Sequence, residues 1–385
     1  MKDLIQIEAL LTPEEINIRD LVKAFVTEEV MPLITDAYEQ ATFPQHLIKR
    51  LADLGLLGLT LPPEMSGAGC GDVIYGLVCQ ELERGDSALR SFVSVQNSLC
   101  MYPIFTFGDE QQCQRWLPAM SRGDLTGCFG LTEAQGGSDP AAMLTTAKAV
   151  KGGWLLNGSK QWITNAPFAD IAIVWAKTEE GIQAFVVEKE TKGFERQKIT
   201  HKMSLRASAT GSLFFTDCFV PEDNRLAGTS QGLKAALSCL TQARYGVAWG
   251  AIGAAMACFD ITLDYLSERH VFGRALSGFQ LVQKALSETY TEIMKAQLLN
   301  LQTGRLKESG SANPVLISMA KRSACHQALK IAREMRNLLG GNGITLDYHV
   351  IRHMMNLESV STYEGTDNIH HLILGQYLTG ISAFA

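Results

Sequence analysis

The sequence lacks the glycine-rich signatures with which many enzymes bind nucleotides. No GxGxxG follows a predicted strand, and neither GxxxxGKS nor GxxxxGKT occurs. These absences argue against a doubly wound dinucleotide-binding fold and against a P-loop. Any nucleotide cofactor must therefore be held in another way.

Positive charge and paired cysteines are also missing. The formal net charge is -6, which argues against nucleic acid as the main partner. The nine cysteines are scattered and form no CxxC pair, so neither a zinc motif nor a thioredoxin-like motif is present. We interpret these cysteines as mostly reduced, small apolar residues in a cytosol-like compartment.

No apolar run is long enough to cross a bilayer, because the longest, at 247–259, has about 13 residues. The first segment, MKDLIQIEALLTPEEI, is acidic and amphipathic. It has neither the apolar core of a signal peptide nor the composition of a transit peptide. We therefore expect no membrane insertion, no targeting peptide and a cytoplasmic, bacterial-type location.

What is present is enough apolar sequence for a large core. The 385 residues are 46% hydrophobic and 19% charged, which suits a folded chain of two or three domains. The pattern divides at residues 124 and 229. We predict an α+β multidomain protein: an all-α domain over 1–124, an antiparallel β domain over 125–229 and a four-helix bundle over 230–385.

The outer zones have helical periodicity and the middle zone does not. Thr12, Pro13 and Glu15 predict a capping box at the first helix. In the middle zone, GG at 152–153, NG at 157–158 and EEG at 179–181 separate runs of β-branched and aromatic residues as hairpin or turn signals. Long C-terminal helices are predicted to begin near Leu233, Leu276, Asn313 and Asp347.

Two polar motifs stand in the middle zone, each with a plain structural alternative. CFGLTEAQGGSDP (128–140) could aim backbone N–H groups at a polar ligand, or be an ordinary turn. QWITNA (161–166) places Trp162 and Thr164 on one strand face. They could flank a flat ring, or be a core indole and an edge hydroxyl.

Charged motifs in the helical zones are equally ambiguous on their own. HVIRH (349–353) has two histidines four residues apart but no third ligand at metal-site spacing, so we predict no metal. Arg244, Arg269 and Arg274 either cover solvated faces or grip an anion. LLGGNGITLDYH (338–349) is a helix stop with glycines at the cap.

Arg90 lies among apolar residues, where a guanidinium needs an anion. Glu83 and Asp86, seven and four residues earlier, are internal candidates, and a ligand carboxylate is the alternative. Glu364, in STYEGTDNIHHLILG (361–375), is either a base at the mouth of a helix or a solvated loop residue.

Seven segments in one order identify a resemblance that covers nearly the whole chain. They are FGLTEAQGGSD, QWITNA, MSLRASATG, ARYGVAWG, RHVFG, LLGGNGI and TYEGTDNIHHLILG. Together they resemble the acyl-CoA dehydrogenase family, and the wording is most similar to its glutaryl-CoA branch. The chain departs from that branch at two places. The branch usually reads EGTHDIH and TEPNSGSD, where this chain reads EGTDNIH and TEAQGGSD.

The resemblance implies noncovalent FAD in a homotetramer, with acyl-CoA as substrate and an electron-transfer flavoprotein as electron acceptor. Residues implied for the flavin and its lid are Phe129, Leu131, Thr132, Gly137, Ser138, Trp162, Ile163, Thr164, Thr366, Asp367 and Asn368. Residues implied to reach a neighbouring subunit's cofactor are Arg269, Phe272, Gln280, Asn337, Leu338, Leu339, Gly340 and Gly341.

The resemblance also implies the reaction and its residues. Glu364 would remove the α-proton of the thioester. The site around it would exclude water, which raises the pKa of Glu364. Residues implied to contact the acyl-CoA are Glu83, Arg90, Ser91, Ser138, Arg244, Tyr363 and Gly365. Arg90 and Ser91 would hold a distal carboxylate, with Glu83 nearby, so the expected reaction is dehydrogenation and decarboxylation of glutaryl-CoA to crotonyl-CoA and CO2. A dehydrogenase of another short or dicarboxylic acyl-CoA is the alternative.

Overall fold

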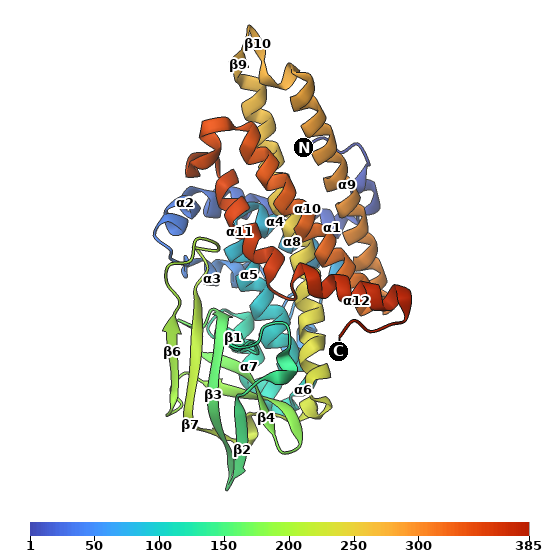
Figure 1. The fold of residues 1–385 in the computed structure, drawn as a ribbon. Coiled ribbons are helices and arrows are strands. Elements are labelled where there is room, and N and C mark those ends of the chain that lie inside the picture. Colours follow the sequence, from blue (N-terminus) through green and yellow to red (C-terminus); the bar gives the residue numbers. More distant parts are fainter. Residues whose placement is uncertain (385) are drawn as a thin grey trace.

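A computed structural model describes residues 1–384 and has the predicted order of helices, sheet and helices (Figure 1). Figure 1 shows the sheet at one end of an elongated molecule and the β9–β10 hairpin at the other, with long helices between. The first zone contains α1 (Pro13–Phe25), α2 (Met31–Glu39), α3 (Leu47–Asp53), α4 (Asp72–Gly85), α5 (Ser87–Ser94), α6 (Tyr102–Phe107) and α7 (Glu110–Ser121).

Local sequence signals set the start of this zone. The predicted capping box is confirmed, since the Thr12 hydroxyl accepts from the N–H of Glu15 and the Glu15 carboxylate accepts from the N–H of Thr12. A π-helical segment, η4 (Val95–Met101), continues α5 without a break. The two segments form one continuous buried helix, which contains the polar residues of α5.

The middle zone is a single sheet in the order β6-β7-β3-β2-β4-β5-β8, with β1 beside β4. Its strands are β1 (Gly127–Gly130), β2 (Thr146–Val150), β3 (Gly153–Thr164), β4 (Ile171–Thr178), β5 (Gly181–Glu188), β6 (Phe194–Lys198), β7 (Thr210–Pro221) and β8 (Arg225–Leu226). Most pairs are antiparallel, as predicted, but β1 pairs with β4 in parallel and β2 meets β4 in a single parallel pair.

Two of the three turn signals in this zone are confirmed. Gly152, at φ 84°, lies in the β2–β3 turn, and Gly181, at φ 121°, follows the β4–β5 turn. The NG pair at 157–158 was wrong as a turn signal, because it lies inside β3 at a shift of register against β7. Gly158 is needed there since a Cβ would come within 2.7 Å of the Thr145 Cα.

The C-terminal zone has five α-helices in place of the predicted four. They are α8 (Leu233–Glu268), α9 (Gln280–Glu308), α10 (Pro314–Leu338), α11 (Val350–Thr362) and α12 (Asp367–Thr379), with the hairpin β9 (His270–Val271) and β10 (Arg274–Ala275) between α8 and α9. The predicted starts at Leu276 and Asp347 were early, because short 3-10 turns precede α9 and α11.

Helix α8 is the central element of the bundle. It is long and apolar enough to cross a membrane by length and composition, but 83% of its most apolar window is buried inside the protein. It packs against α4, α9 and α10. All nine cysteines are free, and every one except Cys70 is buried.

Candidate functional site

Four residues, 363–366, connect α11 to α12 and carry Glu364. Glu364 lies in the left-handed region at φ 56°, and Gly365 follows at φ 94°. A non-glycine residue in this region costs about 1 kcal/mol, so the surrounding structure must stabilise the turn. The Thr366 hydroxyl accepts from the N–H of Ile369 and caps α12.

Two buried cations bind the carbonyls of this turn. Arg244, on α8, donates from Nε to the Glu364 carbonyl at 2.8 Å. Lys321, on α10, donates from Nζ to the carbonyls of Tyr363 and Gly365, both at 2.8 Å. Sequence reasoning missed Lys321. Its signal was a lysine on the apolar face of α10, four residues after the buried Ile317.

The side chain of Glu364 has the environment of a base. Its Oε2 is shielded from solvent and has no hydrogen-bond partner within residues 1–384. Burial raises the pKa of Glu364, while the charges of Arg244, Lys321 and Arg90 oppose that rise. Glu364 as a whole is half-buried, but its Oε2 is shielded from water, and the carboxylate is unpaired and close to three cations.

Arg90 lies beside this turn and is only 2% exposed. Its Nε donates to Glu83 Oε2 at 2.5 Å, and its Nη2 donates to the Tyr363 hydroxyl. These bonds use two of the five guanidinium N–H groups, which leaves three without a partner in the described chain. The predicted Arg90–Glu83 pair is thus present, and the guanidinium still has donors for a further anion.

The other internal candidate for Arg90 pairs elsewhere. The Asp86 carboxylate accepts from Arg352 of α11 and from the Asn356 amide. The Glu83–Arg90 pair is packed so closely against α8 that a Cβ on Gly250 would overlap Glu83 Oε2 and lie 2.9 Å from Arg90 Nε. Sequence reasoning assigned Gly250 no role in the site. Ser91 is buried on α5, and Ser94, one turn beyond Arg90, is a buried hydroxyl that it missed.

The residues predicted to line a flavin come from β1, the loop after it and the end of β3. The carbonyl of Thr132 accepts from the N–H of Gln161, which joins the two motifs. Trp162 is 59% exposed at φ 63°, within a break of the β3–β7 register, while Ile163 is buried beside it. The break leaves Trp162 projecting from the sheet.

A buried ion pair that the sequence did not indicate supports the loop after β1. Lys160 donates to Glu133 at 2.7 Å and to the carbonyl of Leu131 at 3.1 Å. Burial alone would raise the pKa of Glu133, but the N–H groups of Leu144 and Thr145 and the Lys160 ammonium lower it to about 2. Gly137 and Ser138, further along this loop, are exposed.

Packing joins the β1 motif to the helix that supports Glu364. Phe129 and Leu131 belong to the same apolar cluster as Cys239 and Ala243 of α8, and Ala243 precedes Arg244. Figure 1 shows the α11–α12 link at the level where the bundle meets the sheet. One region therefore contains the Glu364 turn, the Arg90–Glu83 pair and the end of the sheet formed by β1 and the last residues of β3.

The residues predicted to reach a neighbouring cofactor do not join this region within one chain. Arg269 and Phe272 lie at the β9–β10 hairpin, which Figure 1 shows at the end opposite the sheet, and Gln280 begins α9. Phe272 is 95% exposed. Residues 337–341 lie at the end of α10, where Leu339 is a core residue and Asn337, Gly340 and Gly341 are exposed, with Leu338 half-buried.

Asp367, which departs from the glutaryl-CoA branch, makes contacts on the surface of the bundle. Its carboxylate lies 3.3 Å from Arg322 Nε of α10 and 3.3 Å from His371 Nε2. The Thr366 hydroxyl already caps α12, and Asn368 is exposed. A lid role for these three residues stays a prediction, and the visible role of Asp367 is to join α10 to α12.

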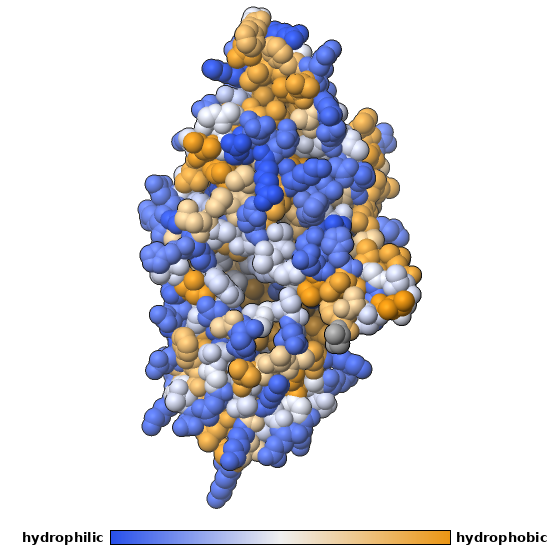
Figure 2. All heavy atoms as spheres, in the orientation of Figure 1, coloured by the Kyte–Doolittle hydropathy of each residue, from blue (hydrophilic) through white to orange (hydrophobic). Residues whose placement is uncertain are grey.

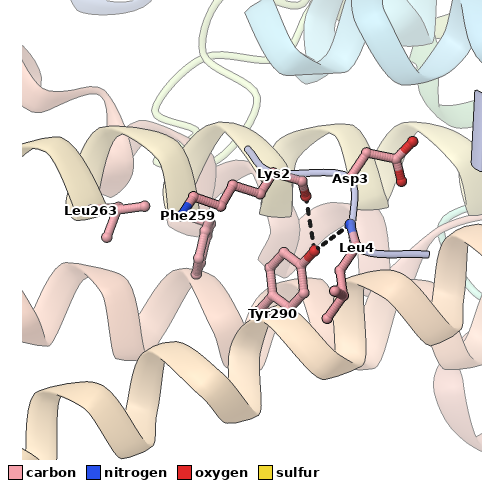
Figure 3. A pocket seen from close by; sticks show the side chains of 6 residues that line it. All are labelled: Lys2, Asp3, Leu4, Phe259, Leu263 and Tyr290. Carbon is pink, nitrogen blue, oxygen red and sulfur yellow. Dashed lines mark hydrogen bonds between the residues drawn. The ribbon is translucent and has the colours of Figure 1, made fainter. Parts of the chain in front are cut away.

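A surface pocket of about 360 Å³ lies away from all of these residues. Figure 3 shows its lining of Lys2, Asp3, Leu4, Phe259, Leu263 and Tyr290. The Tyr290 hydroxyl accepts from the N–H of Leu4 and donates to the carbonyl of Lys2. The pocket is mostly apolar, and the two hydrogen bonds of Tyr290 attach the N-terminal segment to α9. We therefore assign the pocket no chemistry.

The end of β3 and the loop after β1 fit a flat aromatic cofactor. Trp162 offers a large exposed ring, and the hydroxyls of Thr164 and Ser138 make no hydrogen bond within residues 1–384. Space beside Gly137 is open, since a Cβ there would meet no atom within 4 Å. These residues could accept a ring and its polar edge without displacing the core.

Three family models match in sequence along the chain. They are the acyl-CoA dehydrogenase N-terminal domain over 12–124, the middle domain over 128–218 and the C-terminal domain over 230–379. Each match is continuous and falls within one of the three zones of the fold.

Solved structures and a characterised relative agree with these matches. The chain is 47% identical to glutaryl-CoA dehydrogenase from Mycobacterium smegmatis, with a TM-score of 0.98 over 100% of this chain and 99% of that one. A glutaryl-CoA dehydrogenase from the same organism in complex with FADH2 is 45% identical, with a TM-score of 0.98 over 99% and 98% of the two chains. Rat mitochondrial short-chain specific acyl-CoA dehydrogenase is 34% identical over 94% of this chain and 89% of that protein. By sequence, fold and site, this chain belongs to the acyl-CoA dehydrogenase family and is an FAD-dependent oxidoreductase.

Proposed function

We propose that this protein oxidises glutaryl-CoA and decarboxylates the product to crotonyl-CoA and CO2. The observation that carries the proposal is Arg90, a guanidinium that is 2% exposed and keeps three N–H groups free after bonding Glu83 and Tyr363. A desolvated guanidinium matches a carboxylate in both charge and geometry. The identity to the two glutaryl-CoA dehydrogenase structures supports the same substrate.

The proposed base is Glu364. Its carboxylate, with Oε2 shielded from water, takes the α-proton of the thioester, and its raised pKa brings its basicity closer to neutral pH. Its backbone N–H donates no hydrogen bond within residues 1–384 and is available for the thioester oxygen. Bound FAD supplies the acceptor for the hydride that leaves the β-carbon. Trp162 and Thr164, at the end of β3, would hold its ring.

Decarboxylation follows from the electronics of the oxidised product. The carboxylate at the γ-carbon is then conjugated through the new double bond to the thioester. Breaking its C–C bond releases CO2 and leaves the electron pair as a dienolate, which needs one proton to become crotonyl-CoA. Glu364 holds the proton that it removed in the first step and can return one. Arg90 would orient the carboxylate during this sequence.

Assembly as a homotetramer is also proposed. Exposed apolar side chains occur at the hairpin end and near the C-terminus, and they include Phe272, Leu281, Leu378 and Ile381. Figure 2 shows apolar atoms gathered at the hairpin end and around α12. A neighbouring subunit would cover these surfaces and bring Arg269, Gln280 and the 337–341 segment to the cofactor of another chain. An electron-transfer flavoprotein is the proposed electron acceptor.

The second candidate is dehydrogenation of a short acyl-CoA without decarboxylation. Glu83 already neutralises Arg90, so the pocket could accept an uncharged acyl tail. The relative named for short-chain acyl-CoA is consistent with this candidate.

A substrate panel separates the two candidates. The purified holoprotein is given glutaryl-CoA, butyryl-CoA and other acyl-CoA thioesters with a one-electron dye, and the products are identified by mass spectrometry. The proposal expects crotonyl-CoA and CO2 from glutaryl-CoA as the fastest reaction. Faster turnover of butyryl-CoA would reject the substrate, and accumulation of glutaconyl-CoA would reject the decarboxylation.

A further inference from the structure

Lys321 is buried in a way that lysines rarely are. It is 1% exposed on the inner face of α10, where its helical neighbours Ile317, Ala324 and Cys325 are apolar core residues. Within residues 1–384, no carboxylate lies within ion-pair distance of its ammonium. Burial of a cation without a counter-ion is unfavourable unless all of its donors find acceptors.

The acceptors that Lys321 finds are the carbonyls on both sides of Glu364. Its Nζ lies 2.8 Å from the Tyr363 oxygen, 2.8 Å from the Gly365 oxygen and 3.5 Å from the Ser361 oxygen. An ammonium has three donors, and these three carbonyls use them. Ser361 belongs to the last turn of α11, where a cation also matches the negative end of the helix dipole.

Lys321 and Arg244 together fix the turn from two helices. Lys321 binds the carbonyls before and after Glu364, and Arg244 binds the carbonyl of Glu364 itself. The left-handed backbone at Glu364 therefore lies between three fixed carbonyls. Because a peptide unit is planar, fixing these carbonyls also fixes the N–H groups and the direction of the Glu364 side chain.

We propose that Lys321 is a positioning residue for α-proton removal, which holds the carboxylate and the backbone N–H of Glu364 in their working arrangement. The inference rests on the proposed role of Glu364 as the base. Lys321 itself bonds only to backbone carbonyls of the protein and is not a catalytic residue.

The charge of Lys321 has a second effect on the same group. The charged and titratable groups that face Glu364 are Arg90 on α5, Cys239 and Arg244 on α8, Lys321 on α10 and His370 on α12, while Asp367 acts on Lys321 from the start of α12. Burial raises the pKa of Glu364, and the three cations in this set oppose the rise. Removing the Lys321 charge should raise that pKa further and move the acid limb of the kcat–pH profile to higher pH.

Three variants test the inference in the flavin-loaded, assembled enzyme. Lys321→Met removes the charge and the donors at similar length, and Lys321→Arg keeps the charge while changing the geometry. Lys330→Met is the matched control, because Lys330 is an exposed lysine on the same helix. Flavin absorbance, kcat, KM and the pH profile are measured with whichever acyl-CoA the unaltered enzyme turns over fastest. Hydrogen exchange is measured over residues 361–367.

Lys321→Met should retain flavin and change KM less than threefold, while kcat falls about 100-fold, the loss expected from a misplacement of about 1 Å. Its acid limb should move to higher pH, and amides of the turn should exchange at least tenfold faster than in Lys330→Met. Lys321→Arg should keep the acid limb of the unaltered enzyme with an intermediate kcat.

Unaltered kcat, pH profile and exchange in flavin-loaded Lys321→Met would overturn the inference. If Lys321→Met does not fold with flavin, Lys321→Arg decides. Its kcat should then fall about tenfold with an unmoved acid limb, and values equal to the unaltered enzyme would overturn the inference. Glu364→Gln, measured in parallel, keeps the two proposals distinct. An active Glu364→Gln rejects the base assignment, whereas an inactive Glu364→Gln beside a fully active Lys321→Met rejects only the role of Lys321.

Discussion

Arg90 offers the sharpest test of substrate choice, because its guanidinium has both an internal partner and free donors. Replacing Arg90 with Met removes every guanidinium donor that could meet a distal carboxylate, at a position where Arg90 is 2% exposed. Removing one partner of a buried charge pair costs about 3–5 kcal/mol. At 1.4 kcal/mol for each factor of ten, kcat/KM for glutaryl-CoA should fall about 100- to 4,000-fold.

The same substitution should affect an uncharged acyl chain much less. Butyryl-CoA has no carboxylate to leave unpaired, so its kcat/KM should change by less than about tenfold. Glu83 is fully buried and would lose its cation in Arg90→Met, which could destabilise the fold. The double variant Glu83→Gln with Arg90→Met removes both charges and is the matched control for that effect.

Steady-state assays with both thioesters, at equal flavin content, measure the selectivity. Both variants should lose glutaryl-CoA activity and keep butyryl-CoA activity. Equal losses for the two substrates in the double variant would show that Arg90 has a structural role only and would refute the argument.

Three further outcomes are expected. Gly250→Ala should push Glu83 and Arg90 apart and lower kcat/KM for glutaryl-CoA about tenfold more than for butyryl-CoA, and a uniform loss would contradict this expectation. Because burial raises the pKa of Glu364 above 4.5 and a base works only when deprotonated, kcat should rise with pH through a midpoint above 4.5; a midpoint at or below 4.5 would contradict the assignment. Asp367→Asn should lower the free energy of unfolding by less than about 1 kcal/mol, since its ion pairs are partly exposed, and should leave flavin content unchanged; loss of flavin would instead place Asp367 in the cofactor site.

Local patterns predicted the parts of the fold that depend on neighbouring residues. The Thr12 capping box, the turns at Gly152 and Gly181 and the helix stop at Gly340 involve residues close in sequence, and all are present. The NG pair at 157–158 has the same local signal as a turn, but pairing with β7 keeps it inside β3. Tertiary pairing outweighed the local preference at that position.

The candidate site likewise has parts that the sequence predicted and parts that only the tertiary structure decided. The sequence by itself determined the order of the three zones and pointed to Glu364, Arg90 and the Trp162 strand, because periodicity and motif wording are local properties of a chain. Only the tertiary structure decided that Arg90 pairs with Glu83 and not Asp86, and that Lys321 holds the Glu364 turn. Arg90 and Tyr363 are 273 residues apart, and their contact exists only because α5, α8, α10 and α11 pack together. Burial among these helices raises the pKa of Glu364, and no stretch of sequence shows which groups will be desolvated together.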